Sequence, residues 1–421
     1  MATENLSDSM LTIAKASRDA SAVLASCATE TKNNALYAIA EAIRHQSAVI
    51  QTENEKDMHL AKQKGLEKAF LDRLELNEQR IQAMAQGLEA IAKLPDPVGR
   101  VLHTEKRPNG LEITRISTPI GVILVIYESR PNVTADAAGL CLKSGNAVIL
   151  RCGSESFHSA NAILKAFHTG LTNVQLPLTT VQMVPTPKRE ALDALLKMEH
   201  YIDVIIPRGG PKLIEFISRE SRIPVFKHLA GLCHTYIHQE AELTMARKVL
   251  LNAKMRRTGI CGATEILLID QKIAAAFLPS ILNDLLDANC EVRAEPQVVA
   301  LNSRVKMACA KDYDTEFLDS IIAIKVVPDL SAAIDHIAQH STHHTEAIIT
   351  EDKSAAERFL KEVDSAIVMH NTSTQFADGG EFGMGAEIGI ATGKLHARGP
   401  VGLEQLTTFK YAVRGNGQIR S

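Results

Sequence analysis

The spacing of hydrophobic residues separates a helical first part of the chain from a mixed remainder. In the first hundred residues apolar side chains recur every three or four positions, as in Asn34–Ile50 and from Ile81 to Leu94. This period predicts amphipathic helices. Gly65 and the proline-containing stretch Leu94–Pro97 are suitable helix ends. The N-terminal region is therefore expected to be helical throughout.

After Arg107–Gly110 short apolar runs alternate with helical stretches, in two successive blocks. The runs expected to form strands are, in the first block, Gly121–Ile126, Ala147–Leu150, Thr180–Val184, Asp203–Ile206 and His234–His238, and in the second block Glu265–Ile269, Ile321–Val327, Glu346–Thr350 and Ser365–Met369. Helices such as Ile273–Asp287 and Leu330–Gln339 lie between strands of the second block. Such alternation is typical of right-handed βαβ units and parallel sheets. The pattern predicts an α/β protein with two lobes.

Two further strands stand apart from these blocks. Leu111–Thr118 alternates apolar and polar residues, and the tail from Leu406 has a similar character. Lone strands of this kind need a partner, because a single strand leaves its backbone groups unpaired. We expect them to pair with each other or with another subunit.

Composition excludes several classes of function. The 421 residues are 45% hydrophobic and 23% charged, which is ordinary for a globular protein of two or three domains. The net charge of −3, 4% aromatic residues and absence of Trp argue against nucleic-acid and lipid partners. Apolar runs such as Ile120–Ile126 are far shorter than the ~20 residues of a membrane span, and the polar N-terminus does not resemble a signal peptide.

The seven cysteines are scattered and contain no CxxC pair. This count predicts neither a disulfide framework nor a zinc ribbon, so we expect a reducing, cytoplasmic setting and no metal. His340–His344 lacks the spacing of a metalloprotease helix and is interpreted as a helix end or solvated loop.

Nucleotide phosphates have no standard binding motif here, since neither GxGxxG nor GxxxxGK[ST] occurs. The glycine-rich candidates are Ile206–Gly210 and Gly379–Gly385. The first follows an expected strand and precedes a helix, an arrangement that offers backbone N–H groups to an anion. The alternative is an ordinary turn whose glycines adopt left-handed dihedral angles.

Cys261 is the cysteine whose surroundings suggest chemistry. It lies in the basic, glycine-flanked loop Arg256–Ala263, where arginines could favour the thiolate and glycines could admit a substrate. The alternative is a buried structural thiol. The remaining candidates are divided into helical packing residues (Cys27, Cys141 and Cys290) and two that adjoin strands (Cys152 and Cys233).

Seven segments, in order along the chain, carry a specific resemblance. They are Val125–Thr134, Leu142–Arg151, Ile206–Gly210, Asn252–Lys254 leading to Cys261, Glu362–Ser365, Asp378–Glu387 and Lys394–Pro400. On these residues the chain resembles the gamma-glutamyl phosphate reductases of the aldehyde dehydrogenase superfamily. The resemblance favours Cys261 as the nucleophile.

The resemblance implies an aldehyde-dehydrogenase-like α/β fold with two Rossmann-like lobes and a small β oligomerisation element. The expected division is 1–108 and 119–230 for an NADP-binding domain, 231–375 for the catalytic domain, and 109–118 with 376–421 for the oligomerisation element and C-terminal segment. Arg151, Ser154, Gly209, Gly210 and Glu316 match cofactor-binding positions of the family, with NADPH as the cofactor.

For the reaction, the resemblance implies NADPH-dependent reduction of L-glutamyl 5-phosphate to glutamate 5-semialdehyde, in proline biosynthesis, through a thioester on Cys261. The Cys261 backbone N–H and the Asn132 side chain are candidate oxyanion donors. Arg130, His396 and Arg398 are candidates for binding the substrate's anionic groups, or else structural ion-pair partners. A separate glutamate 5-kinase would supply the acyl phosphate, and a homo-oligomer is expected.

One segment departs from hydrolytic aldehyde dehydrogenases, in which a glutamate activates water. Here that segment reads His228–Gly231, so the carboxylate is missing. A reductase instead needs to exclude water from its thioester. The alternatives are an aldehyde or acyl-phosphate dehydrogenase with another substrate, and a non-catalytic binding protein on the same scaffold.

Overall fold

The computed structural model describes residues 2–227 and 230–420. The chain forms two compact units. Unit 1 comprises Met1–Lys227, Gly383–Gly389 and Val401–Ser421, and unit 2 comprises His228–Phe382 and Ile390–Pro400. Within the described ranges no helix is long and apolar enough to cross a membrane.

Unit 1 begins with five helices, as the periodicity predicts. They are α1 (Ala2–Ala25), α2 (Thr29–His45), α3 (Ser47–Gln63), α4 (Lys68–Leu74) and α5 (Glu78–Lys93). The single helix expected over Asn34–Ile50 is divided at Gln46, whose φ of −95° and ψ of 11° end α2 and start α3. The apolar stripe of α2 is fully buried, with Ile39 and Ile43 inaccessible to solvent.

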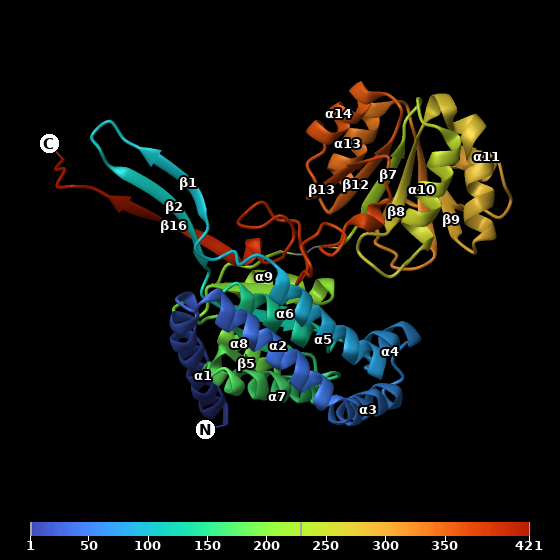
Figure 1. Ribbon diagram of the computed structural model, residues 1–421. Helices are drawn as coiled ribbons and strands as arrows, with labels where there is room; N and C mark the ends of the chain where they lie inside the picture. The colour runs from blue at the N-terminus through green and yellow to red at the C-terminus, as the bar shows by residue number, and fades with distance from the viewer. Residues whose placement is uncertain (1, 228–229, 421) are drawn as a thin grey trace. The chain divides into compact units, whose positions relative to one another are not determined.

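A four-stranded parallel sheet forms the centre of unit 1. Its strands are β3 (Val122–Tyr127), β4 (Ala147–Cys152), β5 (Val181–Met183) and β6 (Val204–Arg208), in the order β5-β4-β3-β6. The connecting elements are α6 (Val133–Lys143), α7 (Phe157–Asn173), η1 (Leu178–Thr180) and α8 (Arg189–Leu195), and α9 (Pro211–Glu220) follows β6. Helices α6 and α7 pack on one face beneath α2 and α5, and α8 packs with α1 (Figure 1).

The order of these strands reverses direction at β3, because β4 and β5 lie on one side of it and β6 on the other. In open α/β sheets ligands bind outside the carboxyl ends of the strands at this point. The turns that follow β3, β4 and β6 are therefore the part of unit 1 to inspect for a cofactor site.

Unit 1 also carries a separate three-stranded antiparallel sheet. It contains β1 (Val101–Lys106), β2 (Glu112–Pro119) and, after η4 (Glu404–Leu406), β16 (Thr407–Arg414). The two lone strands predicted from the sequence pair with each other along eight residues. Strand β1 was not predicted, because all six of its residues are exposed and it has no apolar face. The sheet projects from the rest of unit 1 (Figure 1).

Unit 2 is built on a seven-stranded parallel sheet in the order β10-β9-β11-β8-β7-β12-β13. The strands are β7 (Cys233–Ile237), β8 (Thr264–Asp270), β9 (Glu291–Ala294), β10 (Lys306–Met307), β11 (Ile321–Val327), β12 (Thr345–Ile349) and β13 (Ile367–His370). The helices are α10 (Leu243–Met255), α11 (Gln271–Asp287), α12 (Pro296–Val299), η2 (Ala310–Asp314), α13 (Leu330–His340), α14 (Lys353–Glu362) and η3 (Thr374–Phe376). A separate antiparallel pair of short strands joins β14 (Ile390–Ala391) to β15 (Gly399–Pro400).

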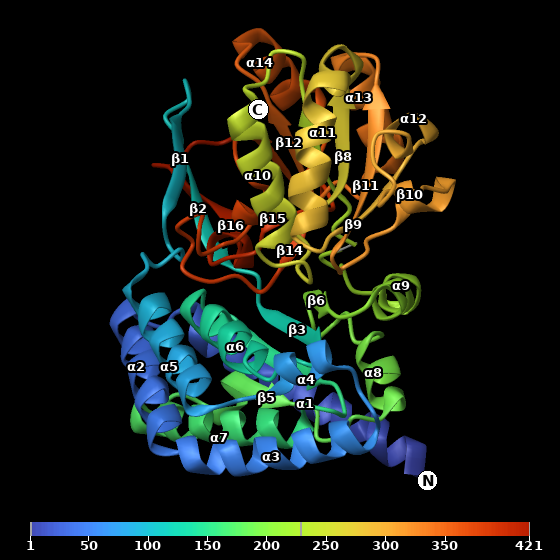
Figure 2. The same cartoon turned by 90° about the vertical axis from the view of Figure 1, so that its right-hand side faces the viewer.

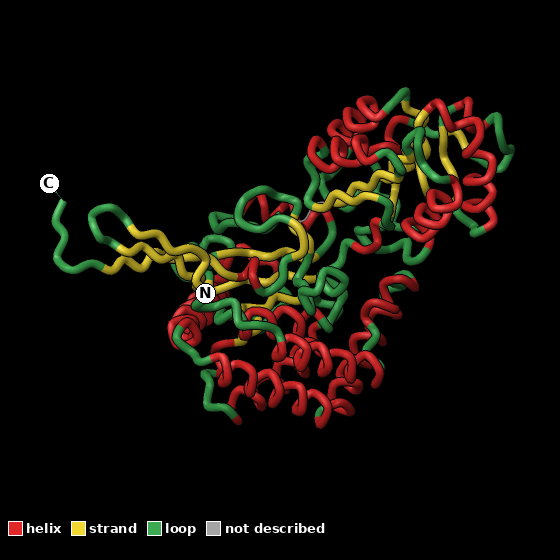
Figure 3. Tube along the Cα trace, turned by 45° about the horizontal axis from the view of Figure 1, so that its top comes forward, coloured by secondary structure: helices red, strands yellow, loops and turns green. Residues whose placement is uncertain are grey.

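Helices cover both faces of this sheet. One hydrophobic cluster joins α10 and α11 to the sheet, and a second joins α13 and α14 to its other face. Figure 2 shows α10 and α11 in front of the strands, and Figure 3 shows helices on either side of them. The strand expected over His234–His238 was grouped with the first block, but it belongs to this second sheet, where it pairs with β8 and β12.

The boundaries of the units differ in detail from the ranges expected from the resemblance. The first crossing between units follows Lys227. Residues 101–106 join the three-stranded sheet, and the segment after residue 375 is divided between the two units. Local sequence patterns do not show which unit a segment joins, because this depends on contacts between distant segments.

Candidate active site

The loop that carries Cys261 connects α10 to β8 in unit 2 and is fixed at both ends. Cys261 itself is half-buried. From η3, the Gln375 side-chain nitrogen donates to the carbonyl oxygens of Ala253 at 2.9 Å and Arg257 at 3.2 Å. A Cβ on Gly262 would lie 3.1 Å from the backbone of η3. The loop is therefore held closely against η3, which limits the movement of the thiol.

The segment before β7 supports the same loop from another side. A Cβ on Gly231 would lie 2.1 Å from the carbonyl oxygen of Cys261, so only glycine fits there. The Cys233 thiol donates to that carbonyl oxygen at 3.0 Å. The N–H of Gly231 donates to Glu316 Oε1 at 2.8 Å. The structure thus brings Glu316, predicted as a cofactor residue, next to the cysteine loop.

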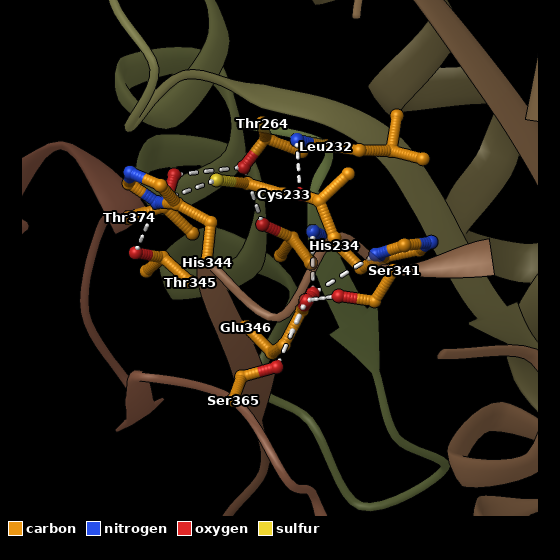
Figure 4. A network of polar contacts seen from close by, with 12 residues as sticks. Leu232, Cys233, His234, Thr264, Ser341, His344, Thr345, Glu346, Ser365 and Thr374 are labelled. Atoms are coloured by element: carbon orange, nitrogen blue, oxygen red, sulfur yellow. Dashed lines mark hydrogen bonds and ion pairs between the residues drawn. The ribbon is translucent and has the colours of Figure 1, made fainter. Parts of the chain in front are cut away.

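A buried polar network anchors the start of β7 (Figure 4). The backbone N–H and ring Nδ1 of His234 bond to Glu346 Oε2 at 2.8 and 2.9 Å. Ser341 and Ser365 donate to the other oxygen of Glu346. His344 lies fully buried, with Nδ1 3.6 Å from Cys233 Sγ. Residues 340–344 were interpreted as a helix end or solvated loop: α13 does end at His340, but a solvated loop is wrong for His344, which is buried beside Cys233.

Burial distinguishes the seven cysteines. Cys141, Cys152, Cys233 and Cys290 are buried. Burial raises the pKa of all four thiols, to about 12 for Cys152 and Cys290. A thiol in such surroundings stays protonated and is a poor nucleophile. Cys261 is half-buried and is not among these four.

A fully buried ion pair joins α10 to β8 on the two sides of the loop. Lys254 Nζ donates to Glu265 Oε2 at 2.6 Å, and both side chains are inaccessible to solvent. Burial raises the pKa of Glu265 to about 7, against the opposing effect of Lys254. Burial also raises the pKa of Glu316, opposed by its bond from Gly231. Fixed charges with perturbed pKa values are common at functional sites.

In unit 1, two predicted cofactor residues lie at the carboxyl end of β4. Arg151 Nη2 donates to the carbonyl oxygen of Pro187 at 2.8 Å, and its buried Nε has no hydrogen-bond partner within the described part of the chain. Ser154 is exposed and donates to Glu155 at 3.3 Å. An arginine with unused donors at this edge suits the extra ribose phosphate of NADP. These residues fit the cofactor expected from the resemblance.

In the glycine turn after β6 the interpretation by left-handed dihedral angles is wrong, whereas the backbone does meet an anionic group, which belongs to this chain. Neither Gly209 nor Gly210 has a positive φ. Instead, a Cβ on Gly209 would lie 2.6 Å from Glu128 Oε2. The N–H of Gly210, expected to face an anion, donates to that same oxygen at 3.1 Å. The turn is glycine-rich because the Glu128 carboxylate approaches its backbone.

The candidates for binding substrate anions fall in different units. Arg130 lies between β3 and α6 in unit 1, whereas His396 and Arg398 lie between β14 and β15 in unit 2. Arg398 Nη1 and Lys394 Nζ each lie 2.6 Å from Asp364, and they lower the pKa of its carboxyl to about 2. Arg398 is thus an ion-pair partner of Asp364 in this structure. Of the two roles that the sequence left open for it, substrate binding and a structural ion pair, its contacts match the second.

Asn132, the candidate oxyanion donor, precedes α6 in unit 1. It contacts Asp136, a residue that the sequence analysis did not single out. Its side-chain nitrogen donates to Asp136 Oδ2 at 2.9 Å. Burial raises the pKa of Asp136 to about 6, against this hydrogen bond and the charge of Arg208. Helical periodicity alone gave no signal for Asp136, since a polar residue in a first turn is ordinary.

The missing carboxylate at His228 was the sequence argument against a hydrolytic enzyme. His228 and Leu229 lie outside the described residues, which resume at position 230. Gly231, the last residue of that segment, is the one packed against Cys261.

Two α/β units, a small antiparallel sheet and a cysteine held in a fixed loop match a known family. The family model described as "Aldehyde dehydrogenase family" matches residues 3–300, and the chain belongs to this family. An acetylating aldehyde dehydrogenase from Geobacillus thermoglucosidasius, at 15% identity, has the same fold with a TM-score of 0.71 over 100% of this chain and 99% of that chain. The predicted α/β fold class is confirmed.

Within the family, the similar proteins are gamma-glutamyl phosphate reductases. That of Rhodospirillum rubrum is 58% identical over 420 residues, covering 100% of this chain and 98% of the relative. That of Paramagnetospirillum magneticum is 57% identical over 420 residues, covering 100% and 99%. The crystal structure of the reductase from Thermotoga maritima is 42% identical and has a TM-score of 0.96, covering 98% of this chain and 100% of that chain. The resemblance stated from the sequence is confirmed.

Proposed function

We propose that this chain is a gamma-glutamyl phosphate reductase, which reduces L-glutamyl 5-phosphate to L-glutamate 5-semialdehyde and phosphate with NADPH, as a step of proline biosynthesis. The observation that carries the proposal is Cys261, a half-buried cysteine in a loop fixed by Gln375 and Gly231. Full-length relatives of that name, at 58% identity, support it.

In the first step Cys261 Sγ bonds to the acyl carbon of the substrate. The bond from that carbon to the phosphate oxygen breaks, and phosphate leaves with the electron pair. A thioester remains on Cys261. The carbonyl oxygen gains negative charge during the attack, and preorganised N–H donors stabilise such charge. We assign this role to the Cys261 N–H and the Asn132 amide, which still has one N–H after its bond to Asp136.

NADPH, when bound, supplies the hydride that reduces the thioester. We assign Arg151, Ser154, Gly209 and Gly210 in unit 1 and Glu316 in unit 2 to its binding. Arg151 Nη2 is bound to the Pro187 carbonyl oxygen and its Nε is buried, so Nη1, which has no hydrogen bond within the described part of the chain, is the donor left for a phosphate oxygen. Glu316 presents a carboxylate whose Oε1 already accepts from Gly231, so its second oxygen is the one offered to a hydroxyl group. After reduction, Cys261 leaves as the thiolate and the semialdehyde is released.

The reverse reaction tests this proposal. Glutamate 5-semialdehyde, supplied in equilibrium with its cyclic form pyrroline-5-carboxylate, is mixed with NADP⁺ and phosphate, and the absorbance of the reduced cofactor is followed. We expect turnover that requires phosphate and disappears in Cys261→Ala. Turnover without phosphate would mean that water resolves the thioester, making this a hydrolytic aldehyde dehydrogenase. Unchanged turnover by Cys261→Ala would refute the role of the cysteine.

We also propose a homo-oligomer that uses the three-stranded sheet. In the described part of the chain β1 and β16 each pair only with β2, so both have an open edge. Val101, Tyr411 and Val413 on these strands are 63%, 62% and 56% exposed. Open edges with exposed apolar side chains are normally covered. Analytical ultracentrifugation of wild type and Tyr411→Lys/Val413→Lys tests this, and a wild-type monomer at micromolar concentration would refute it.

A cytoplasmic location and a supply of acyl phosphate by a separate glutamate 5-kinase complete the proposal. All seven cysteines are unpaired, which suits a reducing compartment. Acyl phosphates hydrolyse readily, so association with the kinase would protect the intermediate. Co-purification of the tagged chain with a glutamate 5-kinase from the same cell tests the association. Failure of the two purified proteins to bind at micromolar concentrations would refute it.

A further inference from the structure

A carboxylate and a guanidinium in unit 1 lie near each other without forming an ion pair. Asp136, in the first turn of α6, uses Oδ2 to accept from Asn132 at 2.9 Å. Its Oδ1 has no hydrogen-bond partner among the residues that the structure describes. Arg208, the last residue of β6, is half-buried, and its guanidinium likewise has no bond or ion pair there. The Arg208 charge nevertheless lowers the pKa of Asp136.

Two glycines lie close to these two groups. Gly87 lies in the interior of α5, where glycine costs about 1 kcal/mol relative to alanine. The nearest atom that a Cβ there would meet is Asp136 Oδ1, at 4.0 Å. At Gly389 a Cβ would lie 2.9 Å from Arg208 Cδ and 3.1 Å from its Nη1, so the backbone passes directly over the guanidinium. Gly87 therefore places no side chain in front of the carboxylate, and Arg208 is confined from one side.

We infer that Asp136 and Arg208 form the subsite for the amino-acid head of the substrate, with Asp136 binding the α-ammonium group and Arg208 the α-carboxylate. This inference rests on the proposed function. An L-glutamyl group carries these two charges about 2.5 Å apart, on atoms bonded to the same carbon. Each forms hydrogen bonds of about 2.8 Å to its partner. A carboxylate and a guanidinium separated by more than an ion-pair distance suit such a zwitterion.

The spacing along α6 agrees with this assignment. Asn132 and Asp136 lie one helical turn apart, and Asn132 Nδ2 donates to Asp136 Oδ2 at 2.9 Å, so Oδ1 is the carboxylate oxygen farther from the amide. In an extended glutamyl chain the acyl carbon and the α-nitrogen are four bonds apart, about 5 Å. With the Asn132 amide at the acyl oxygen, Asp136 Oδ1 is the oxygen left for the ammonium group at the other end of that chain. One helix end would then hold both ends of the substrate.

The test uses two analogues that each lack one charge. In the reverse reaction, 5-oxopentanoate has the carboxylate without the ammonium group, and 4-aminobutanal has the amine without the carboxylate. We expect Asp136→Asn to lower kcat/KM for glutamate 5-semialdehyde by about ten- to a hundredfold, the value of a lost charge-assisted bond. The same variant should change kcat/KM for 5-oxopentanoate less than twofold.

Arg208→Gln provides an independent arm with the opposite pattern. It should lower kcat/KM for glutamate 5-semialdehyde similarly and leave 4-aminobutanal nearly unchanged. Gly87→Ala, which favours the helical state, should raise KM for the natural aldehyde with little change in kcat. Asp193→Asn, at another half-buried aspartate of unit 1, is the matched control and should behave as wild type.

Equal losses on all three aldehydes would overturn the inference, because a structural or general catalytic role affects every substrate alike. Wild-type activity of both variants on the natural aldehyde would overturn it as well. Failure of the proposed function has a different signature. In that case the wild-type chain itself shows no phosphate-dependent turnover of glutamate 5-semialdehyde, or Cys261→Ala remains active.

Discussion

Replacing Asp136 by asparagine should make the folded protein more stable at neutral pH, although it removes a functional group. Burial raises the pKa of this carboxyl from 3.8 to about 6 in the folded chain. Because the folded-state pKa lies above the unfolded value, folding disfavours the ionised form. The penalty is present above about pH 7, shrinks as the pH falls through 6, and vanishes below the unfolded pKa.

The size of the effect follows from the shift. About two pKa units correspond to about 3 kcal/mol at 1.36 kcal/mol per unit. Asp136 retains some solvent exposure, and screening lowers the value, so we expect a gain of about 1–3 kcal/mol at pH 8. Asparagine can still accept the Asn132 hydrogen bond through its amide oxygen. The contribution of that bond is therefore largely preserved.

Thermal and urea unfolding of wild type and Asp136→Asn between pH 5 and 8 measure this gain, with Asp193→Asn as the control. The variant should be more stable at pH 8, and its advantage should decrease steadily towards pH 5. Equal stability of the two proteins at pH 8, or an advantage that does not change with pH, would refute the reasoning. If the prediction holds, Asp136→Asn raises the stability of the protein and lowers its kcat/KM for the natural aldehyde, as expected where function is maintained at a cost in stability.

Three further predictions concern two close-packed glycines and one buried ion pair. Gly231→Ala places a Cβ 2.1 Å from the Cys261 carbonyl oxygen, so displacement of the loop should lower kcat by about a hundredfold. A Cβ at Gly210 meets nothing within 4 Å, so Gly210→Ala should leave the fold unchanged. Steady-state kinetics and circular dichroism check both variants. Lys254→Met leaves the buried Glu265 unpaired and should cost about 3–5 kcal/mol in urea unfolding, a loss that Glu265→Gln in the same chain should partly restore. Gly170→Ala places a Cβ within 2.7 Å of backbone atoms of α2 and should lower the melting temperature, and an unchanged value would show that α2 and α7 separate easily.

The elements that could be predicted are those whose signal is local. Strands such as β3 and β8 are continuous apolar runs with all residues buried, and the helices of the N-terminal region have a clear stripe. Strand β1 has no such signal, because its six residues are exposed and its pairing with β2 alone defines it. The break at Gln46 was missed for a similar reason, since the apolar period continues through it.

The same distinction applies to the site. Cys261 could be singled out as a candidate from its own loop, because glycines and arginines flank it, and the family resemblance favoured it over a structural thiol. Its supports could not, since Cys233 lies 28 residues away and Gln375 binds Ala253 across 122 residues. The partner of the Gly210 N–H, the Glu128 carboxylate, is 82 residues distant. These contacts depend on the fold as a whole, and no local pattern records them.

The pairing of β2 with β16 has a consequence for how the protein is made. Unit 1 contains both ends of the chain, and Asn146 beside its sheet donates to the carbonyl oxygen of Leu406, 260 residues later. At about 5–20 residues per second, a ribosome needs roughly 13 to 52 s to synthesise that interval. Unit 2 can complete its sheet during this time, while β2 still lacks β16 and Asn146 still lacks Leu406. A nascent chain thus exposes one strand edge of β2 until β16 emerges, and chaperone binding during synthesis should concentrate there.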